Sequence, residues 1–235
     1  MKNSKRRVVI LGDSLGMPRP DEEIAIQYEE TYPYLLRSFL KEWEVISVCK
    51  RGNNVENQVH PQYLFDDIEV YNPKYVVIYL GVVDCAPRLF SQRQQKLLRQ
   101  LPGAMGKRII SFFSNHRSFF TRLCKKVYVT KVDYQKYMEK LINFVLAKDA
   151  IPIIINIVDT NEENKARSYN FTDNILEYNK ILLALTQKYK LQLIDIYNLG
   201  LDFVLPDGIH LNVKGNEEVA RRIAAIISGK KQSLA

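Results

Sequence analysis

The chain has 235 residues, of which 46% are hydrophobic and 26% charged, and its formal net charge is +8. This length and composition predict one globular domain with a sizeable core, spanning residues 1–235 without linkers, repeats or low-complexity tracts. No apolar stretch approaches the roughly 20 residues that a membrane-spanning helix needs, so no such helix is expected.

The cysteines and the N-terminus bear on where the protein resides. Cys49, Cys85 and Cys124 are odd in number and lack the spacing of a metal site, which indicates a reducing compartment without disulfides. The basic N-terminus is followed by the apolar residues 8–11, a run too short for a secretory signal. The sequence therefore predicts a cytoplasmic protein with no metal site, and no cofactor is expected.

The expected elements alternate along the chain between short apolar runs, typical of strands, and segments with helical periodicity. The strands are expected at 8–11, 44–48, 75–80, 151–157 and 191–196. The helices are expected at 28–41, 61–70, 132–148, 169–190 and 213–227. This alternation predicts βαβ units, and hence a three-layer α/β/α sandwich around a mostly parallel five-stranded sheet.

The segment at about 88–131 fits this alternation poorly and is expected to be a partly helical insertion. Between Ala86 and Lys131 there are eleven Lys or Arg residues and no Asp or Glu. Because the whole chain carries +8, the remainder carries about −3. The charge therefore predicts a basic patch on the insertion and not a uniformly basic surface.

A candidate nucleophile follows the first expected strand, in the tetrapeptide Gly12-Asp13-Ser14-Leu15. Ligands bind at the carboxyl edge of open parallel sheets, and this position places Ser14 at that edge. A serine there acts as a nucleophile only when a base and an orienting acid arrive from elsewhere in the chain. Taken alone, the tetrapeptide is equally compatible with a strand-end turn.

A candidate base and acid stand near the C-terminus, in Asp207-Gly208-Ile209-His210. One short loop can present both groups, with the carboxylate bonded to one imidazole nitrogen and the other nitrogen facing a serine. The alternative is a surface turn, because Asp-Gly is a strong turn signal. The other histidines, His60 and His116, have no partners in sequence and are expected in packing or at the surface.

In combination, these segments resemble the motif blocks of the SGNH or GDSL-type serine hydrolases. The block of the nucleophile matches at Ser14, and the Asp-x-x-His block matches at Asp207 and His210. Gly52 stands where the family has the glycine whose N–H serves the oxyanion hole. The residues Gly81-Val82-Val83-Asp84 stand in place of Gly-x-Asn-Asp.

The resemblance implies the flavodoxin-like SGNH fold and acyl transfer through a covalent intermediate. Ser14 would attack an ester carbonyl, with His210 as general base and Asp207 as the group that holds the imidazole tautomer. The N–H groups of Ser14 and Gly52 would form the oxyanion hole. Asp13 and Asp84 are expected to support their loops.

One departure from the family pattern concerns the oxyanion hole. The family's asparagine falls on Val83, which has no side-chain donor, and losing such a donor typically costs about 10²–10³ in turnover. Asn53, Asn54 and Asn156 each stand beside an expected strand end and are candidates to replace it. Ordinary loop roles are the alternative for each of these residues.

The function expected from these features is ester hydrolysis, as an esterase or O-deacylase acting on an acylated small molecule or carbohydrate. The alternative is a weakened or non-catalytic member of the family that binds a sugar, lipid or protein. Acyl transfer to an acceptor other than water is a variant of the first.

The insertion begins shortly after Asp84, beside the predicted site, so it is expected to form a lid or one wall of the substrate pocket. Three interpretations stay open for its basic and apolar residues. They steer an anionic substrate or acyl carrier, they rest on an anionic membrane, or the apolar residues pack while Lys and Arg stay solvated. No nucleic-acid motif accompanies the charge, so nucleic acid is not an expected partner.

Overall fold

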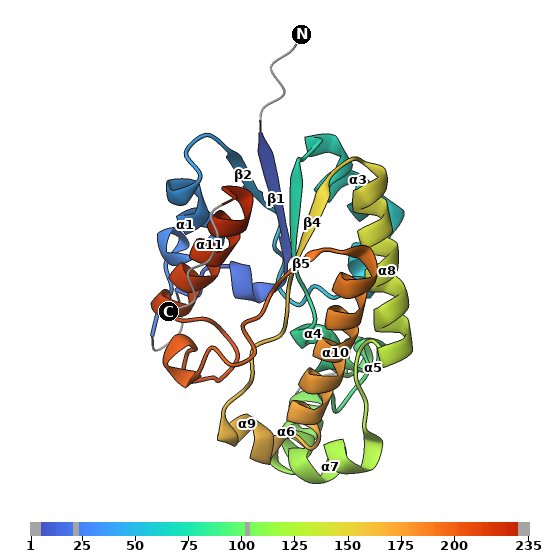
Figure 1. The fold of residues 1–235 in the computed structure, drawn as a ribbon. Helices are drawn as coiled ribbons and strands as arrows, with labels where there is room; N and C mark the ends of the chain where they lie inside the picture. The colour runs from blue at the N-terminus through green and yellow to red at the C-terminus, as the bar shows by residue number, and fades with distance from the viewer. Residues whose placement is uncertain (1–5, 21–23, 102–103, 230–235) are drawn as a thin grey trace.

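The computed structural model describes residues 6–20, 24–101 and 104–229. Its centre is one five-stranded sheet with the order β2-β1-β3-β4-β5, in which every pairing is parallel (Figure 1). The strands are β1 (Arg7–Gly12), β2 (Glu44–Ser47), β3 (Tyr75–Tyr79), β4 (Ile151–Ile155) and β5 (Gln192–Ile194). The predicted five-stranded α/β sheet is confirmed, with no antiparallel strand pair in the described part.

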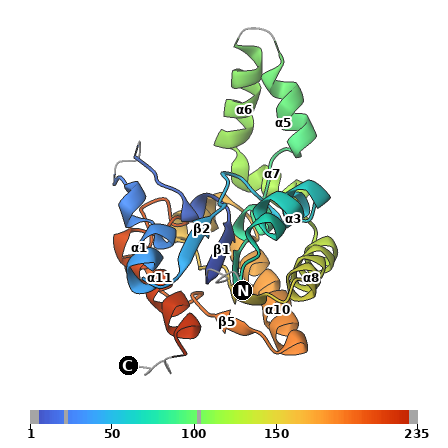
Figure 2. The ribbon, with the colours of Figure 1, turned by 90° about the horizontal axis from the view of Figure 1, so that it is seen from above.

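Helices cover both faces of the sheet, as the alternating pattern predicts. On one face α1 (Tyr32–Phe39) packs against α11 (Val213–Ile227), and on the other α8 (Lys131–Ala147) packs against α10 (Phe171–Tyr189). Figure 2 shows the sheet between these two layers, with α3 (Pro61–Asp67) on the side of α8. Because both faces are covered, the central strands are apolar throughout: all four residues from Val8 to Leu11 are fully buried.

Several short elements lie between these and are absent from the predicted pattern. They are the α-helices α2 (Val55–Gln58), α4 (Val82–Cys85) and α9 (Glu162–Arg167) and the 3-10 helices η1 (Ser14–Gly16), η2 (Tyr28–Glu30), η3 (Glu69–Tyr71) and η4 (Leu201–Phe203). One or two helical turns contain too few residues for a periodic pattern to be visible. For the same reason, the expected helix 28–41 consists of η2 followed by α1, and the expected helix 61–70 consists of α3 followed by η3.

The expected insertion contains α5 (Gln92–Arg99), α6 (Met105–Asn115) and α7 (Arg117–Cys124), while its residues 102–103 lie outside the described residues. Figure 2 shows α5 and α6 projecting from the body of the protein. Phe112, Phe119 and Leu123 are all more than half exposed. A role for this segment as a lid, or in contact with a membrane or acyl carrier, stays a prediction.

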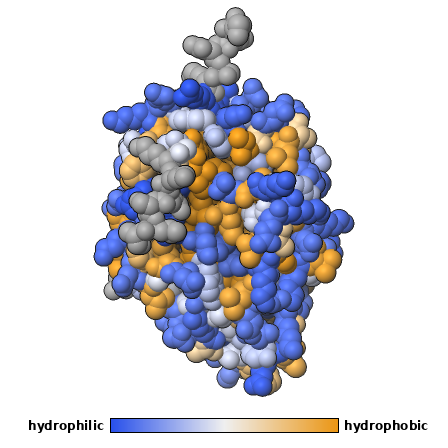
Figure 3. All heavy atoms as spheres, viewed as in Figure 1, coloured by the Kyte–Doolittle hydropathy of each residue, from blue (hydrophilic) through white to orange (hydrophobic). Residues whose placement is uncertain are grey.

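The face of the protein drawn in Figure 3 is mixed in polarity. On the face seen in Figure 3, hydrophilic residues predominate and hydrophobic residues reach the surface mainly in the middle. In the described part of the chain, no helix is long and apolar enough to cross a membrane.

Candidate active site

Ser14 begins η1 immediately after β1, at the carboxyl edge of the sheet. Asp13 caps this 3-10 turn, because its Oδ1 accepts a hydrogen bond from the N–H of Leu15 at 2.8 Å. Asp13 is fully buried and holds the turn from the protein interior. Ser14 is half-buried, so it remains partly accessible at the surface. The local sequence thus places a single polar side chain at the edge where parallel strands bind ligands.

Asp207 and His210 lie in a tight loop just before α11. The His210 carbonyl accepts a hydrogen bond from the N–H of Leu205 at 2.6 Å. Gly208 has φ +66, and a Cβ added to it would lie within 2.6 Å of the Asn161 side chain. Asn164 of α9 donates to the Asp207 carbonyl at 2.6 Å. Helix α9 therefore holds this loop in a conformation that only glycine at position 208 allows.

The fold brings the two loops into contact. The Ser14 Oγ lies 2.9 Å from the Nε2 of His210, and the His210 Nδ1 lies 2.5 Å from the Oδ2 of Asp207. The three side chains thus form one chain of hydrogen bonds, although Ser14 and His210 are 196 residues apart in sequence. This arrangement can withdraw the hydroxyl proton from Ser14 onto an imidazole that a carboxylate orients.

The environment of Asp207 keeps its carboxylate charged. Burial alone would raise its pKa, but hydrogen bonds from the His210 ring and from the N–H groups of His210 and Ile209 lower the pKa to about 2. Hydrogen bonds to the charged form favour that form. Asp207 therefore remains an ionised partner for the imidazole at neutral pH.

The predicted oxyanion hole depends on backbone donors. Gly52, in the turn after β2, is exposed and has φ +68. Within the described residues, the N–H groups of Ser14 and Gly52 donate no hydrogen bond to another residue. Val83 is buried in α4, and its apolar side chain supplies no donor. The structure therefore shows two unengaged amides, and the replacement of the family's asparagine by Val83 stays a prediction.

Two of the three asparagines considered as replacements use their side-chain amides in other hydrogen bonds. Asn53 donates to Gly12 and Gln58, and Asn156 bridges to Asp195 and Ile196.

Asn54 caps α2 through its Oδ1, while its Nδ2 is buried and has no hydrogen-bond partner in the described structure. None of the three asparagines presents an accessible side-chain donor.

Residues 10–218 of the chain match the model of the GDSL-like lipase/acylhydrolase family. The chain belongs to this family. The match includes the Ser14 turn, the Val83 segment and the His210 loop. No curated protein sequence matches the chain.

Solved structures of similar fold cover nearly all of this GDSL-like hydrolase. The lipase/acylhydrolase from Enterococcus faecalis aligns with a TM-score of 0.68 and 18% identity over 97% of this chain and 100% of that chain. The acetyl xylan esterase AlAXEase aligns with a TM-score of 0.62 and 16% identity, over 94% and 99%. A catalytic mutant of Axe2, an acetylxylan esterase from Geobacillus stearothermophilus, aligns at 0.59 and 14%, over 93% and 92%. At these identities the likeness concerns the fold.

Two further carboxyl groups of this GDSL-like hydrolase lie near the site but differ from Asp207. Burial raises the pKa of Asp13 to about 6 and that of Asp84 to about 7. Asp84 accepts a hydrogen bond from the N–H of Val55 at 2.9 Å, which links α4 to α2. Neither group contacts the Ser14 hydroxyl or the His210 ring through a hydrogen bond in the described structure. Their contacts are those of supports for the loops.

Sequence reasoning missed Arg19. Its Nη1 lies 2.9 Å from the His210 Nε2, the same distance as the Ser14 Oγ. Backbone hydrogen bonds with Ile26 in both directions fix Arg19 beside the site. A guanidinium at this place puts a permanent positive charge next to the atoms that would react. No motif marks it, because the contact joins a loop arginine to a residue 191 positions away.

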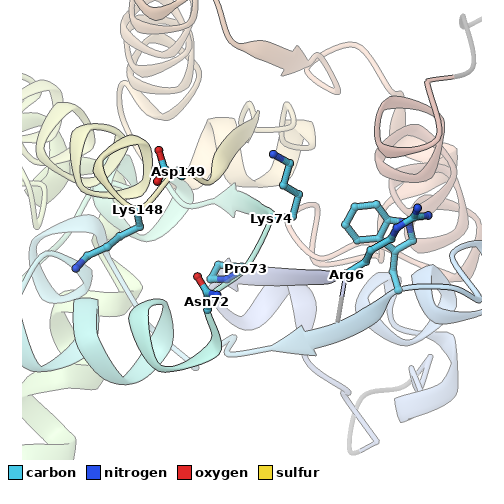
Figure 4. A pocket seen from close by; sticks show the side chains of 7 residues that line it. Arg6, Asn72, Pro73, Lys74, Lys148 and Asp149 are labelled. Atoms are coloured by element: carbon cyan, nitrogen blue, oxygen red, sulfur yellow. The ribbon is translucent and has the colours of Figure 1, made fainter. Parts of the chain in front are cut away.

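The remaining histidines and the cavities complete the description. His60 and His116 are exposed, and no group of three metal-binding side chains occurs among the described residues. A cavity of about 490 Å³ lies at the opposite edge of the sheet, beside Arg6, Lys74 and Asp149, which precede β1, β3 and β4 (Figure 4). It is therefore remote from Ser14 and takes no part in this site.

Proposed function

We propose that this GDSL-like hydrolase cleaves ester bonds with Ser14 as nucleophile, His210 as general base and Asp207 as the orienting acid. The observation that carries the proposal is the continuous hydrogen-bonded chain from Ser14 Oγ through the His210 ring to Asp207. The family and its esterase neighbours support an ester-hydrolysing enzyme.

The reaction runs in two halves. Ser14 attacks the ester carbonyl while His210 Nε2 takes the hydroxyl proton, and the ionised Asp207 stabilises the imidazolium. His210 then protonates the leaving alcohol, and the acyl group stays on Ser14. Water, deprotonated by the same imidazole, releases the acid. In both halves the N–H groups of Ser14 and Gly52 donate to the negatively charged oxygen.

The substrate we propose is an acylated small molecule or carbohydrate, with a short acyl group. Two structural neighbours are named as acetylxylan esterases, which supports removal of an O-acetyl group from a sugar. Other neighbours are named as lipases, and one fold supports many substrates. A cytoplasmic location stays a prediction.

The alternative function is binding without efficient catalysis. Val83 removes a side-chain donor that this family uses for the oxyanion, and Arg19 shares the His210 Nε2 with Ser14. Both features favour a weakened enzyme that holds a sugar, lipid or protein. The two functions differ in whether Ser14 is a reactive nucleophile.

A fluorophosphonate probe separates them. We expect one covalent adduct on the wild type, read by intact mass, and none on Ser14→Ala of equal thermal stability. The probe-labelled wild type and Ser14→Ala should both lose hydrolysis of short-chain 4-nitrophenyl esters. A folded wild type that forms no adduct would refute the nucleophile and favour the binding function. Activity that survives in Ser14→Ala would refute the assignment of Ser14.

A further inference from the structure

A second cavity lies inside the insertion and contains two arginines. It has a volume of about 240 Å³ and is lined by Arg88, Phe90, Gln95, Ile110, Ser114 and Arg117, with Leu89 between the first two. A space of this size holds roughly eight water molecules at about 30 Å³ each, or a small anionic group with a short apolar neighbour. Phe90 and Ile110 supply apolar walls.

Arg88 is half-buried and makes only neutral contacts. Its Nη2 donates to the Val83 carbonyl at 3.0 Å, and its guanidinium carbon lies 4.2 Å from the centre of the Tyr128 ring. Its Nε is shielded from solvent and has no hydrogen-bond partner in the described structure. A charged group with an unsatisfied buried donor is costly unless an acceptor completes it.

Arg117 is also half-buried, and its partners are neutral as well. Its Nε donates to the Ser168 Oγ and its Nη2 to the Pro87 carbonyl, both at 2.7 Å. Burial lowers the pKa of both Arg88 and Arg117, and the positive charges of Arg88 and Arg167 lower that of Arg117 further. Like charges are thus gathered in a place where water is scarce.

No carboxylate in the described part of the chain lies within ion-pair distance of this cluster. Among the described residues, neither Arg88 nor Arg117 forms an ion pair. Asp84 attracts Arg88 electrostatically, but burial raises the pKa of Asp84 to about 7, and its Oδ1 accepts a hydrogen bond from Val55. The segment that carries both arginines contains no Asp or Glu between residues 86 and 131. The described residues therefore leave both guanidinium groups without an ion-pair partner, which is the contact that an oxyanion would supply.

We propose that the cavity between Arg88 and Arg117 binds an oxyanion, the phosphate or carboxylate group of a small and partly apolar ligand. Guanidinium groups match both kinds of oxyanion through paired N–H donors. The Ser114 hydroxyl and the Gln95 amide line the same space and add polar contacts. The apolar walls accommodate the part of the ligand next to its charge.

The cavity is linked to the site of the proposed function. Arg88 donates to the carbonyl of Val83, the residue that the sequence motif aligns with the family's oxyanion asparagine, so the anion would lie one side chain away from that segment. Resting on the proposed function, the inference therefore makes the substrate an ester that carries a negative charge. The binding of the anion itself does not depend on Ser14.

Calorimetric titration with inorganic phosphate and, separately, with butyrate tests the site. We expect one oxyanion per chain on the wild type, and about tenfold to hundredfold weaker binding in Arg117→Gln, which loses charge-assisted hydrogen bonds. Ser114→Asp keeps both arginines and their hydrogen bonds but brings a competing carboxylate into the cavity, so it should weaken anion binding by a similar factor. Arg108→Gln, an exposed arginine of α6, removes the same charge and should leave binding within twofold.

The results separate the ligand classes and the two proposals. Binding of phosphate or of butyrate supports the site and shows which oxyanion it prefers. If neither binds, or if Arg108→Gln weakens binding as much as Arg117→Gln, the site is refuted. If phosphate binds but the fluorophosphonate probe does not label Ser14, the site stands and the proposed hydrolase function fails.

The substrate part has its own readout in active enzyme. Arg117→Gln should raise KM about tenfold or more for mono-4-nitrophenyl succinate, whose acyl group is anionic, and leave kcat/KM for neutral 4-nitrophenyl butyrate within twofold. An equal effect on both esters would refute a role in recognising charged substrates.

Discussion

Ser14, His210 and Asp207 form a continuous chain of hydrogen bonds, whereas the predicted oxyanion hole has only the backbone N–H groups of Ser14 and Gly52, because Val83 supplies no side-chain donor. We call these the proton-transfer side and the oxyanion side. The proton-transfer side depends on side chains that are 196 residues apart in sequence. Contacts from α9 and the turn at Gly208 fix the loop that carries two of them. The oxyanion side depends on amides that any residue carries.

The difference has a consequence for catalysis. A triad without an oxyanion donor can still form an acyl-enzyme slowly, because removing one donor costs only part of the rate enhancement. Oxyanion donors without a triad have no activated nucleophile. The proton-transfer side therefore decides whether the reaction occurs, and the oxyanion side sets how fast it is. Changes on the two sides should differ in size and sign.

The largest effect is expected from Asp207→Asn. The NH2 of an amide in place of the carboxylate can donate to Nδ1 and so favour the wrong imidazole tautomer. The amide also carries no negative charge to stabilise the imidazolium, and a change of this kind typically lowers kcat about 10⁴-fold. Steady-state hydrolysis of a neutral ester measures it, with the exposed Asp202→Asn as control. A loss below about tenfold would show that Asp207 does not orient His210.

The next effect concerns the support of the oxyanion side and is read as stability. Asp84 has a pKa of about 7 in the folded protein because burial opposes its charge, against 3.8 ordinarily. Between these pH values the unfolded chain loses the proton while the folded chain keeps it. The free energy of unfolding therefore falls as pH rises from about 4 to about 7, by about 4 kcal/mol for this group.

Asp84→Asn should remove this pH dependence, because its amide stays neutral and its oxygen still accepts from Val55. Urea unfolding at pH 4 and at pH 8 measures the contribution. The variant should match the wild type at pH 4 and exceed it by about 4 kcal/mol at pH 8. Asp202→Asn, at an exposed position, should follow the wild type at both values. If the free energy of unfolding changed equally between pH 4 and pH 8 in Asp84→Asn and in the wild type, Asp84 would not be a buried neutral carboxyl group.

These two carboxyl groups also show what the sequence could and could not predict. The parallel sheet could be predicted from the apolar runs along the chain. The contact between Ser14 and His210 could be predicted from the combination of sequence motifs. The pKa values of Asp84 and Asp207 could not be read from the sequence, because they depend on burial and on N–H groups that only the folded chain supplies. Helix α9 escaped prediction because six residues are too few for a periodic signal.

A smaller change is expected on the oxyanion side itself. Val83→Asn would introduce a side-chain amide at the position that the sequence motif aligns with the family's donor. We expect turnover of a short-chain ester to rise by up to about 10². Val83→Ala removes the same methyl groups without adding a donor and serves as control. An equal gain in both variants would mean that space, and not a hydrogen bond, limits the reaction; no gain would mean that α4 does not present position 83 to the oxyanion.

The smallest effect should come from Arg19, on the proton-transfer side. The neutral His210 ring has one lone pair on Nε2, and the Arg19 Nη1 and the Ser14 Oγ both lie 2.9 Å from that atom. Arg19→Met should leave the lone pair to Ser14 and raise kcat/KM for a neutral ester about two- to tenfold, the equivalent of roughly 0.5–1.5 kcal/mol for one hydrogen bond. Arg51→Met is the matched control, because Arg51 also bonds to this loop, through the Pro18 carbonyl, but does not contact His210. A fall in activity for Arg19→Met alone would instead assign the guanidinium to the substrate or to the developing negative charge, and the oxyanion side would then be more complete than Gly52 and Val83 suggest.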